Sequence, residues 1–195
     1  FIGNYSSGKM GFALAEACAE RGAEVTLVAG PVSLKTHHPA IKRIDVESAG
    51  EMYQAAMTAF PSSDAAILCA AVADYRSENA SEQKIKRETE GEMTLHLVPN
   101  PDIAASLGAI KREGQVMVGF ALETNDEATH AEGKLKRKNL DFIVLNSLRD
   151  QGAGFRCDTN KITIIDNAGG VTSYPLKTKR EVACDIVNKL VTLLK

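Results

Sequence analysis

Short hydrophobic runs alternate with longer segments of helical periodicity along this chain. The short runs are typical of strands and cover residues 24–29, 42–46, 65–71, 93–98, 116–121 and 142–145. The segments with helical periodicity cover residues 8–21, 48–60, 101–112, 126–139 and 179–194. Two further runs, 162–165 and 171–174, flank Asn167-Ala-Gly-Gly and predict a C-terminal β-hairpin.

This alternation predicts an α/β protein. We expect a Rossmann-like fold of three layers, with a mostly parallel central sheet covered by helices on both faces and a C-terminal β-hairpin region. Residues 1–195 are expected to form one domain, because no second domain and no repeat is visible. The chain starts at Phe1 without a methionine and enters a helix almost at once, so we expect that an upstream strand is absent from it.

The composition narrows the class of protein. Hydrophobic residues make up 44% and charged residues 25% of the chain, which is typical of soluble globular proteins, and a net charge of -2 argues against bulk binding of nucleic acid. No segment approaches the roughly 18 apolar residues of a membrane span. Since no signal-peptide pattern is present either, we expect a cytoplasmic protein with no nucleic-acid or membrane partner.

Cysteine and histidine usage indicates packing rather than metal binding. The cysteines Cys18, Cys69, Cys157 and Cys184 are far apart and form no Cys-x-x-Cys motif. The histidines show no ligand spacing. We therefore expect reduced cysteines and no structural metal.

The segment after the run 65–71 carries the first candidate chemistry. The small residues Ala70 and Ala71 are followed by Asp74, and Lys84 and Lys86 come about ten residues later. In open α/β sheets, ligands bind at the carboxyl ends of strands, and a carboxylate with mobile cations suits a polyphosphate with its metal ion. A solvated surface loop explains the same charges equally well.

A second candidate lies at the first helix. Residues 3–9, Gly-Asn-Tyr-Ser-Ser-Gly-Lys, fit the first seven positions of a Walker A loop, but Met10 stands where a hydroxyl should hold magnesium. A P-loop nucleotidase is therefore disfavoured. The serines, Gly8 and the helix start still suit an anion.

Six blocks together resemble a known family. In this order and spacing, the chain closely resembles bacterial phosphopantothenoylcysteine synthetase, and the resemblance covers nearly the whole chain. The blocks are FIGNYSSGKMGFALAEACAERGAEVTLVAGPV, AAVADYR, KIK, NPDI, GFALET and KLKRKNLDFIVLN. In most bacteria such a domain is fused behind an FMN-dependent phosphopantothenoylcysteine decarboxylase, and that half and the family's upstream strand are absent from this sequence.

The resemblance implies a ligase of coenzyme A biosynthesis. The carboxylate of 4'-phosphopantothenate would attack the α-phosphate of CTP, with Mg2+, to give an acyl-cytidylate and pyrophosphate, and L-cysteine would then displace CMP. The bacterial form of AVADYR favours CTP over the ATP of eukaryotic relatives. A homodimer is also implied, in which the terminal strands contribute to pairing.

The resemblance also implies site residues. Asn4 and Lys84 match catalytic positions, Lys84 lying on a mobile flap, and Asn4, Ala70 and Ala71 match contacts with the intermediate. Asp74 matches a CTP contact that acts through magnesium or directly. The remaining nucleotide positions are Lys84 itself, Pro101, Asp102, Ile103, Ala104, Phe120, Lys134 and Lys138. Gly3 and Tyr5 replace a serine and a histidine that are common in relatives.

Most of these residues have ordinary structural explanations as well. Asn4 suits a helix cap, and Lys84 lies in a charge run typical of a solvated face. Phe120 fits a buried core position, and Lys134 and Lys138 suit the negative end of a helix dipole, although their i,i+4 spacing puts both on one helix face. Asn100 and Pro101 are expected to cap and open the helix that follows.

Two other functions share much of this pattern. A dinucleotide-dependent reductase would share the fold, but no G-x-G-x-x-G follows a visible strand. A non-catalytic scaffold for the decarboxylase half would keep the core and could lose Asn4 and Lys84, and both are present. The ligase is therefore the preferred interpretation.

Overall fold

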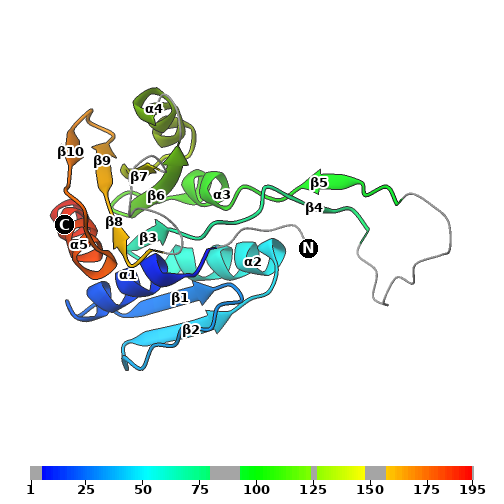
Figure 1. Ribbon diagram of the computed structural model, residues 1–195, viewed down its shortest axis with the longest axis horizontal. Coiled ribbons are helices and arrows are strands. Elements are labelled where there is room, and N and C mark those ends of the chain that lie inside the picture. Colours follow the sequence, from blue (N-terminus) through cyan, green and yellow to red (C-terminus); the bar gives the residue numbers. More distant parts are fainter. Residues whose placement is uncertain (1–5, 80–92, 124–126, 148–156, 195) are drawn as a thin grey trace.

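The computed structural model describes residues 6–79, 93–123, 127–147 and 157–194 (Figure 1). Its helices are α1 (Lys9–Ala19), α2 (Ala49–Ala59), the 3-10 turn η1 (Phe60–Ser62), α3 (Ile103–Ile110), α4 (Glu127–Arg137) and α5 (Lys179–Leu193). Its strands are β1 (Val25–Ala29), β2 (Ile41–Asp45), β3 (Ala65–Leu68), β4 (Tyr75–Ser77), β5 (Leu97–Pro99), β6 (Val116–Glu123), β7 (Phe142–Ser147), β8 (Thr159–Asn160), β9 (Ile162–Asp166), β10 (Val171–Ser173) and β11 (Lys177–Thr178).

A five-stranded mixed sheet with the order β10-β9-β7-β6-β3 forms the centre of the described structure. Strands β3, β6 and β7 are parallel to one another, whereas β9 and β10 are antiparallel to their neighbours. Strands β1 and β2 form a separate parallel pair. The predicted α/β class, the parallel strands and the C-terminal hairpin are thus confirmed.

Each face of this sheet has its own core. Buried side chains of α1 and α5 pack with Val116, Val118 and Val144 on one face. On the other face, α3, α4 and η1 pack against Met117, Ala121 and Ile143. Because side chains alternate along a strand, the continuous apolar sequences of β6 and β7 supply both faces at once. The result is the predicted arrangement of three layers.

Helix α5 is fixed at its start and along its length. The Thr178 hydroxyl accepts a hydrogen bond from the Glu181 amide, and the Glu181 carboxylate accepts one from the Thr178 amide, which makes a capping box. Arg21 donates to Asn188 at 2.6 Å, and Arg180 pairs with Glu20 at 2.7 Å. These contacts hold α5 against the end of α1, while Asp158, which pairs with Lys9 and accepts a hydrogen bond from the Lys179 amide, links the two helix starts.

Strands β4 and β5 form an antiparallel arm that extends away from the central sheet (Figure 1). The sequence pattern did not predict β4, and it predicted a strand at 93–98 where only Leu97–Pro99 pairs. The arm forms because Tyr75 pairs with Pro99 and Ser77 with Leu97, about twenty residues apart. Such pairing is a tertiary contact that hydrophobic alternation does not encode.

Two other element predictions differ from the structure. The predicted strand 65–71 pairs only over Ala65–Leu68, so Ala70 and Ala71 belong to the loop that leaves the sheet. The predicted helix start at Pro101 is also wrong, because α3 begins at Ile103 with Asp102 as its N-cap. The short pair of β8 with β11 was not predicted.

The cysteines Cys18, Cys69, Cys157 and Cys184 are all free thiols, as the sequence predicted. Over the residues that the structure describes, none of the helices has the length and hydropathy needed to cross a bilayer.

Candidate active site

The start of α1 and the residue after β3 are both near Lys179, which interacts electrostatically with Lys9 and with Cys69. Gly8 has a left-handed backbone (φ 77°) and no side chain caps α1, whose first turn also carries no acidic residue. The first helical amides and the positive end of the helix dipole are therefore suited to an anion. This supports the prediction of an anion site there, although Asn4 itself lies outside the described residues.

Two lysines lie near the start of α1. The Lys9 ammonium contacts the Asp158 carboxylate at 2.6 Å, and Lys179, at the start of α5, is only 7% exposed. Burial, and next the charge of Lys9, lower the pKa of Lys179. Burial likewise raises the pKa of the neighbouring Cys69 thiol to about 12. The start of α1 thus has two lysine side chains nearby, together with a thiol that stays protonated at neutral pH.

The loop after β3 is joined to the segment before α3 by Asn100. The Asn100 amide donates to the Asp74 carbonyl, and its side-chain Nδ2 donates to the Ala73 carbonyl, both at 2.8 Å. Arg76 adds a hydrogen bond to the Pro99 carbonyl at 2.6 Å. The expectation that Asn100 caps α3 is therefore wrong, because its side chain joins two site segments instead.

These bonds bring together residues that the sequence predicted separately. Ala70 and Asp74 are exposed and Ala71 is half-buried on the loop after β3, and that loop is tied to the residue that precedes Pro101. The Asp74 carboxylate is thus free to face solvent or a ligand beside the α3 start. Sequence spacing alone could not have shown this, because the two segments are more than twenty residues apart.

Asp102 has two roles at the start of α3. Its carboxylate accepts a hydrogen bond from the Ala105 amide at 3.0 Å and also contacts the Lys138 ammonium at 3.0 Å. Burial alone would raise the pKa of the Asp102 carboxyl, but the Ala105 amide and Lys138 together hold it below its ordinary value. Asp102 therefore carries its negative charge at neutral pH and fixes the Lys138 ammonium near the helix start.

Helix α4 carries Lys134, and Lys138 is the first residue after the helix; both were predicted to contact the nucleotide. Lys134 and Lys138 are half-buried, whereas the intervening Lys136 and Arg137 are exposed. The i,i+4 spacing places Lys134 and Lys138 on one face of the helical turn. The pair with Asp102 shows that the Lys138 ammonium reaches the α3 start. A role in dipole compensation is compatible with the same contacts.

Phe120 lies on the face of the sheet that α1 and α5 cover, opposite the face that α3 and α4 cover. Its half-buried ring packs against the core formed with α1 and α5, whereas α3 and α4 cover the opposite face. The structure therefore does not bring Phe120 together with Lys134 and Lys138 on one face. Only a ligand that crosses the carboxyl edge of β6 could contact both sets.

Asn146 is a candidate that the sequence reasoning missed. It lies near the carboxyl end of β7, opposite Leu122 of β6, and its buried Oδ1 has no hydrogen-bond partner among the described residues. A buried amide oxygen without a donor is unfavourable unless a ligand supplies one. An asparagine directly after an apolar strand, as in FIVLN, is the sequence signal that could have found it.

Among the described residues, no three acidic, histidine or cysteine side chains gather into a metal site. A magnesium ion that is shared with a polyphosphate needs only one or two protein carboxylates, and the exposed Asp74 fits that requirement. Lys84, the predicted catalytic lysine, lies outside the described residues.

Comparisons with known proteins agree on one family. The sequence profile of the DNA/pantothenate metabolism flavoprotein C-terminal domain matches residues 1–194. A curated relative from an unknown prokaryotic organism, named Cysteine/Cysteine sulfinic acid decarboxylase, is 58% identical over 100% of this chain and 54% of its own length. The coenzyme A biosynthesis bifunctional protein CoaBC of Vibrio parahaemolyticus is 46% identical over 100% of this chain and 48% of its own length.

A solved structure gives the same answer. The crystal structure of the C-terminal domain of a CoaBC protein superposes with a TM-score of 0.81 at 35% identity, over 98% of this chain and 85% of that chain. This chain spans about half the length of the curated relatives it matches, and those relatives carry different activity names. The similarity therefore shows the family but not the activity. The chain belongs to the DNA/pantothenate metabolism flavoprotein C-terminal domain family.

Proposed function

We propose that this domain is a phosphopantothenate–cysteine ligase that uses CTP. The observation that carries the proposal is the convergence at the α3 start of residues expected to contact the nucleotide. Asn100 ties the Asp74 loop to the α3 start, and Lys138 reaches the same helix start through Asp102. Family membership supports the ligase over a reductase, since the relatives include CoaBC proteins.

The proposed chemistry has two steps. In the first, a carboxylate oxygen of 4'-phosphopantothenate attacks the α-phosphorus of CTP, the bond to the bridging oxygen breaks, and pyrophosphate leaves. In the second, the amine of L-cysteine attacks the acyl carbon, loses a proton, and CMP leaves with the electrons of the broken C–O bond. Neither step requires a covalent bond to the protein.

The main task of the protein in the first step is to neutralise charge. An anion must approach a polyanion, so fixed cations and helix amides lower the barrier where charge develops. Lys134, Lys138 and the α3 start would hold the triphosphate, and the α1 start would hold a second anionic group. Magnesium, when bound with Asp74 and the phosphates, would supply further charge neutralisation.

Two catalytic assignments stay predictions because they fall outside the described residues. Asn4 is proposed to orient the acyl carbonyl of the intermediate, and Lys84 to neutralise the α-phosphate. A cytoplasmic location and fusion to an FMN-dependent decarboxylase in the full-length protein also stay predictions.

We further propose a homodimer. The β4–β5 arm carries exposed apolar side chains, Tyr75 and Leu97, and Leu95 and Met93 beside them are exposed as well. A second copy that covers this arm would remove that apolar surface from water. The C-terminal strands, which the resemblance implied, expose Val171 on β10. Sedimentation equilibrium measures the stoichiometry directly, and a monomer at micromolar concentration would contradict the proposal.

The decisive experiment follows both half-reactions. Protein containing this chain is incubated with 4'-phosphopantothenate, Mg2+ and CTP or ATP, with and without cysteine, while pyrophosphate and CMP are separated by chromatography. Cysteine-dependent release of CMP is expected. Folded protein that turns over neither nucleotide would overturn the ligase and favour a scaffold.

Matched lysine variants test the site. Removal of one charge-assisted phosphate contact costs about 1.5–3 kcal/mol, so Lys138→Gln should raise the KM for CTP roughly 10- to 100-fold. Lys136→Gln, two residues earlier and exposed, is the control and should change that KM less than twofold. Equal effects of the two variants would show that α4 acts only through its overall charge.

A further inference from the structure

The end of α3 is held by contacts with other elements. Helix α3 ends at Ile110 and Lys111 is extended (φ -58°, ψ 125°), so the carbonyl groups of its last turn need donors from elsewhere. The Gly108 carbonyl accepts a hydrogen bond from the Asn139 side chain at 3.0 Å. Asn139 itself has a left-handed backbone (φ 52°), the one such non-glycine residue in the described ranges.

The backbones of α3 and of the turn after α4 are in direct contact at Gly108. A Cβ atom at this position would lie 2.2 Å from the Lys138 carbonyl oxygen and 2.8 Å from its carbonyl carbon. Only glycine allows this approach without a shift of one backbone relative to the other. The distance between α3 and the end of α4 is therefore set here.

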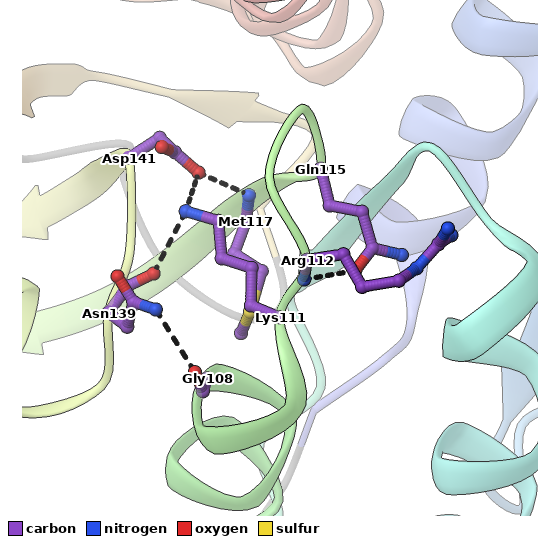
Figure 2. A network of polar contacts seen from close by, with 7 residues as sticks. All are labelled: Gly108, Lys111, Arg112, Gln115, Met117, Asn139 and Asp141. Atoms are coloured by element: carbon purple, nitrogen blue, oxygen red, sulfur yellow. Dashed lines mark hydrogen bonds and ion pairs between the residues drawn. The ribbon is translucent and has the colours of Figure 1, made fainter.

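Lys111 connects this contact to the sheet. Its ammonium donates to the Asn139 carbonyl at 3.2 Å and pairs with Asp141 at 2.6 Å, and the same Asp141 oxygen accepts a hydrogen bond from the Met117 amide of β6 (Figure 2). The Lys111 and Asp141 side chains are only 11% and 20% exposed. We call Gly108, Lys111, Asn139 and Asp141 the α3 clamp.

The clamp and the nucleotide contacts share one segment of chain. Lys138 contacts Asp102 at the start of α3 through its side chain, while its carbonyl and the next residue, Asn139, contact Gly108 near the end. Asp102 and Gly108 are about 9 Å apart along the helix axis at 1.5 Å per residue. A shift of α3 at the clamp therefore moves the Asp102 carboxylate relative to the Lys138 ammonium.

From this geometry we infer that the α3 clamp is a positioning device for CTP. Its residues lie at the amino ends of β6 and β7 and do not reach the candidate site, but they fix the α3 start and the Lys138 ammonium as one unit. The inference rests on the proposed function, because it assigns what the clamp positions. Displacements of about 1 Å at a reacting group can lower rates by roughly two orders of magnitude.

Two substitutions perturb the clamp without touching the site. Gly108→Ala forces the backbones apart at the Lys138 carbonyl. Asn139→Gly keeps the left-handed backbone and removes the side chain that donates to the Gly108 carbonyl, so it is the milder change and is expected to fold even if Gly108→Ala does not. Gly133→Ala is the control, since a Cβ added there on α4 has no neighbour within 4 Å.

The test measures kinetics and binding at a temperature well below the melting point of each variant. We expect a KM for CTP, and a Kd for CTP with Mg2+ by calorimetry, raised about 10-fold in Gly108→Ala and about threefold in Asn139→Gly, while the KM for cysteine stays within twofold. Gly133→Ala should match the wild type. A purely structural clamp would lower the melting temperature and leave these constants unchanged.

The outcomes separate the two proposals. If the wild type binds CTP and both folded clamp variants bind it within twofold of wild type, the positioning role is overturned and the ligase proposal stands. If only Asn139→Gly folds, its KM and Kd decide alone. If the wild type neither binds nor turns over CTP, the proposed function fails and the inference fails with it.

Discussion

Asp102 offers the sharpest test of the described contacts, because its two roles can be removed separately. Asp102→Asn keeps a side-chain oxygen that can accept from the Ala105 amide but loses the charge that pairs with Lys138. Asp102→Ala loses both contacts. The two variants therefore separate the helix cap from the ion pair in one position.

The expected losses follow from the exposure of the pair. Loss of an N-cap costs about 1 kcal/mol. The Asp102 and Lys138 side chains are 47% and 22% exposed, so solvent screens their pair and it contributes only about 0.2–1 kcal/mol. We expect Asp102→Asn to lower the free energy of unfolding by about 0.2–1 kcal/mol and Asp102→Ala by about 1–2 kcal/mol.

Urea unfolding followed by far-ultraviolet circular dichroism measures both losses at neutral pH. The difference in unfolding free energy between the wild type and Asp102→Asn should shrink in high salt, because screening weakens the ion pair. The folded pKa of Asp102 is lowered, so this advantage is complete above the ordinary carboxyl pKa and is lost as pH falls through the lowered value. Equal losses in the two variants, or an advantage that grows on acidification, would refute the reasoning.

Three further substitutions test packing and thiol chemistry. A Cβ at Gly119 would lie 2.5 Å from a methyl group of buried Leu140, so Gly119→Ala should lower unfolding free energy by about 1–3 kcal/mol, whereas Gly133→Ala, with open space, should raise it by about 0.5–1 kcal/mol. If urea unfolding showed that both substitutions change the unfolding free energy in the same direction, the packing argument would be contradicted. Because burial raises the pKa of Cys69 to about 12, Cys69→Ser should leave the number of native thiols that react with Ellman's reagent at pH 8 unchanged. A lower native count would show an exposed Cys69 thiolate.

The layers and the parallel strands could be predicted because their signals are local. The apolar runs of β6 and β7 are continuous, since both faces are buried, and the helices between them carry one apolar face each. The C-terminal hairpin was predicted from the turn residues around Asn167. Each of these elements is specified by residues next to one another in sequence.

The arm and the end of β3 could not be predicted in the same way. Cys69, Ala70 and Ala71 continue the apolar pattern of β3, but they leave the sheet and so end the pairing at Leu68. Strand β4 is short, and Arg76 within it is polar and exposed. Its partner lies about twenty residues further on, so only the folded chain shows the pair.

The start of α3 shows which local features the sequence could predict and which contacts it could not. Asn, Pro and Asp all favour helix starts, so the sequence correctly predicts where the helix begins to within two residues but not which side chain caps it. Asn100 hydrogen-bonds to Ala73 instead, and that choice leaves Asp102 to cap α3 and to hold Lys138. The tertiary hydrogen bond of Asn100 is thus compatible with Asp102, rather than Asn100, as the cap of α3 and the partner of Lys138. An argument from residue types proposes candidate members of such a site, whereas their contacts depend on segments that are distant in sequence.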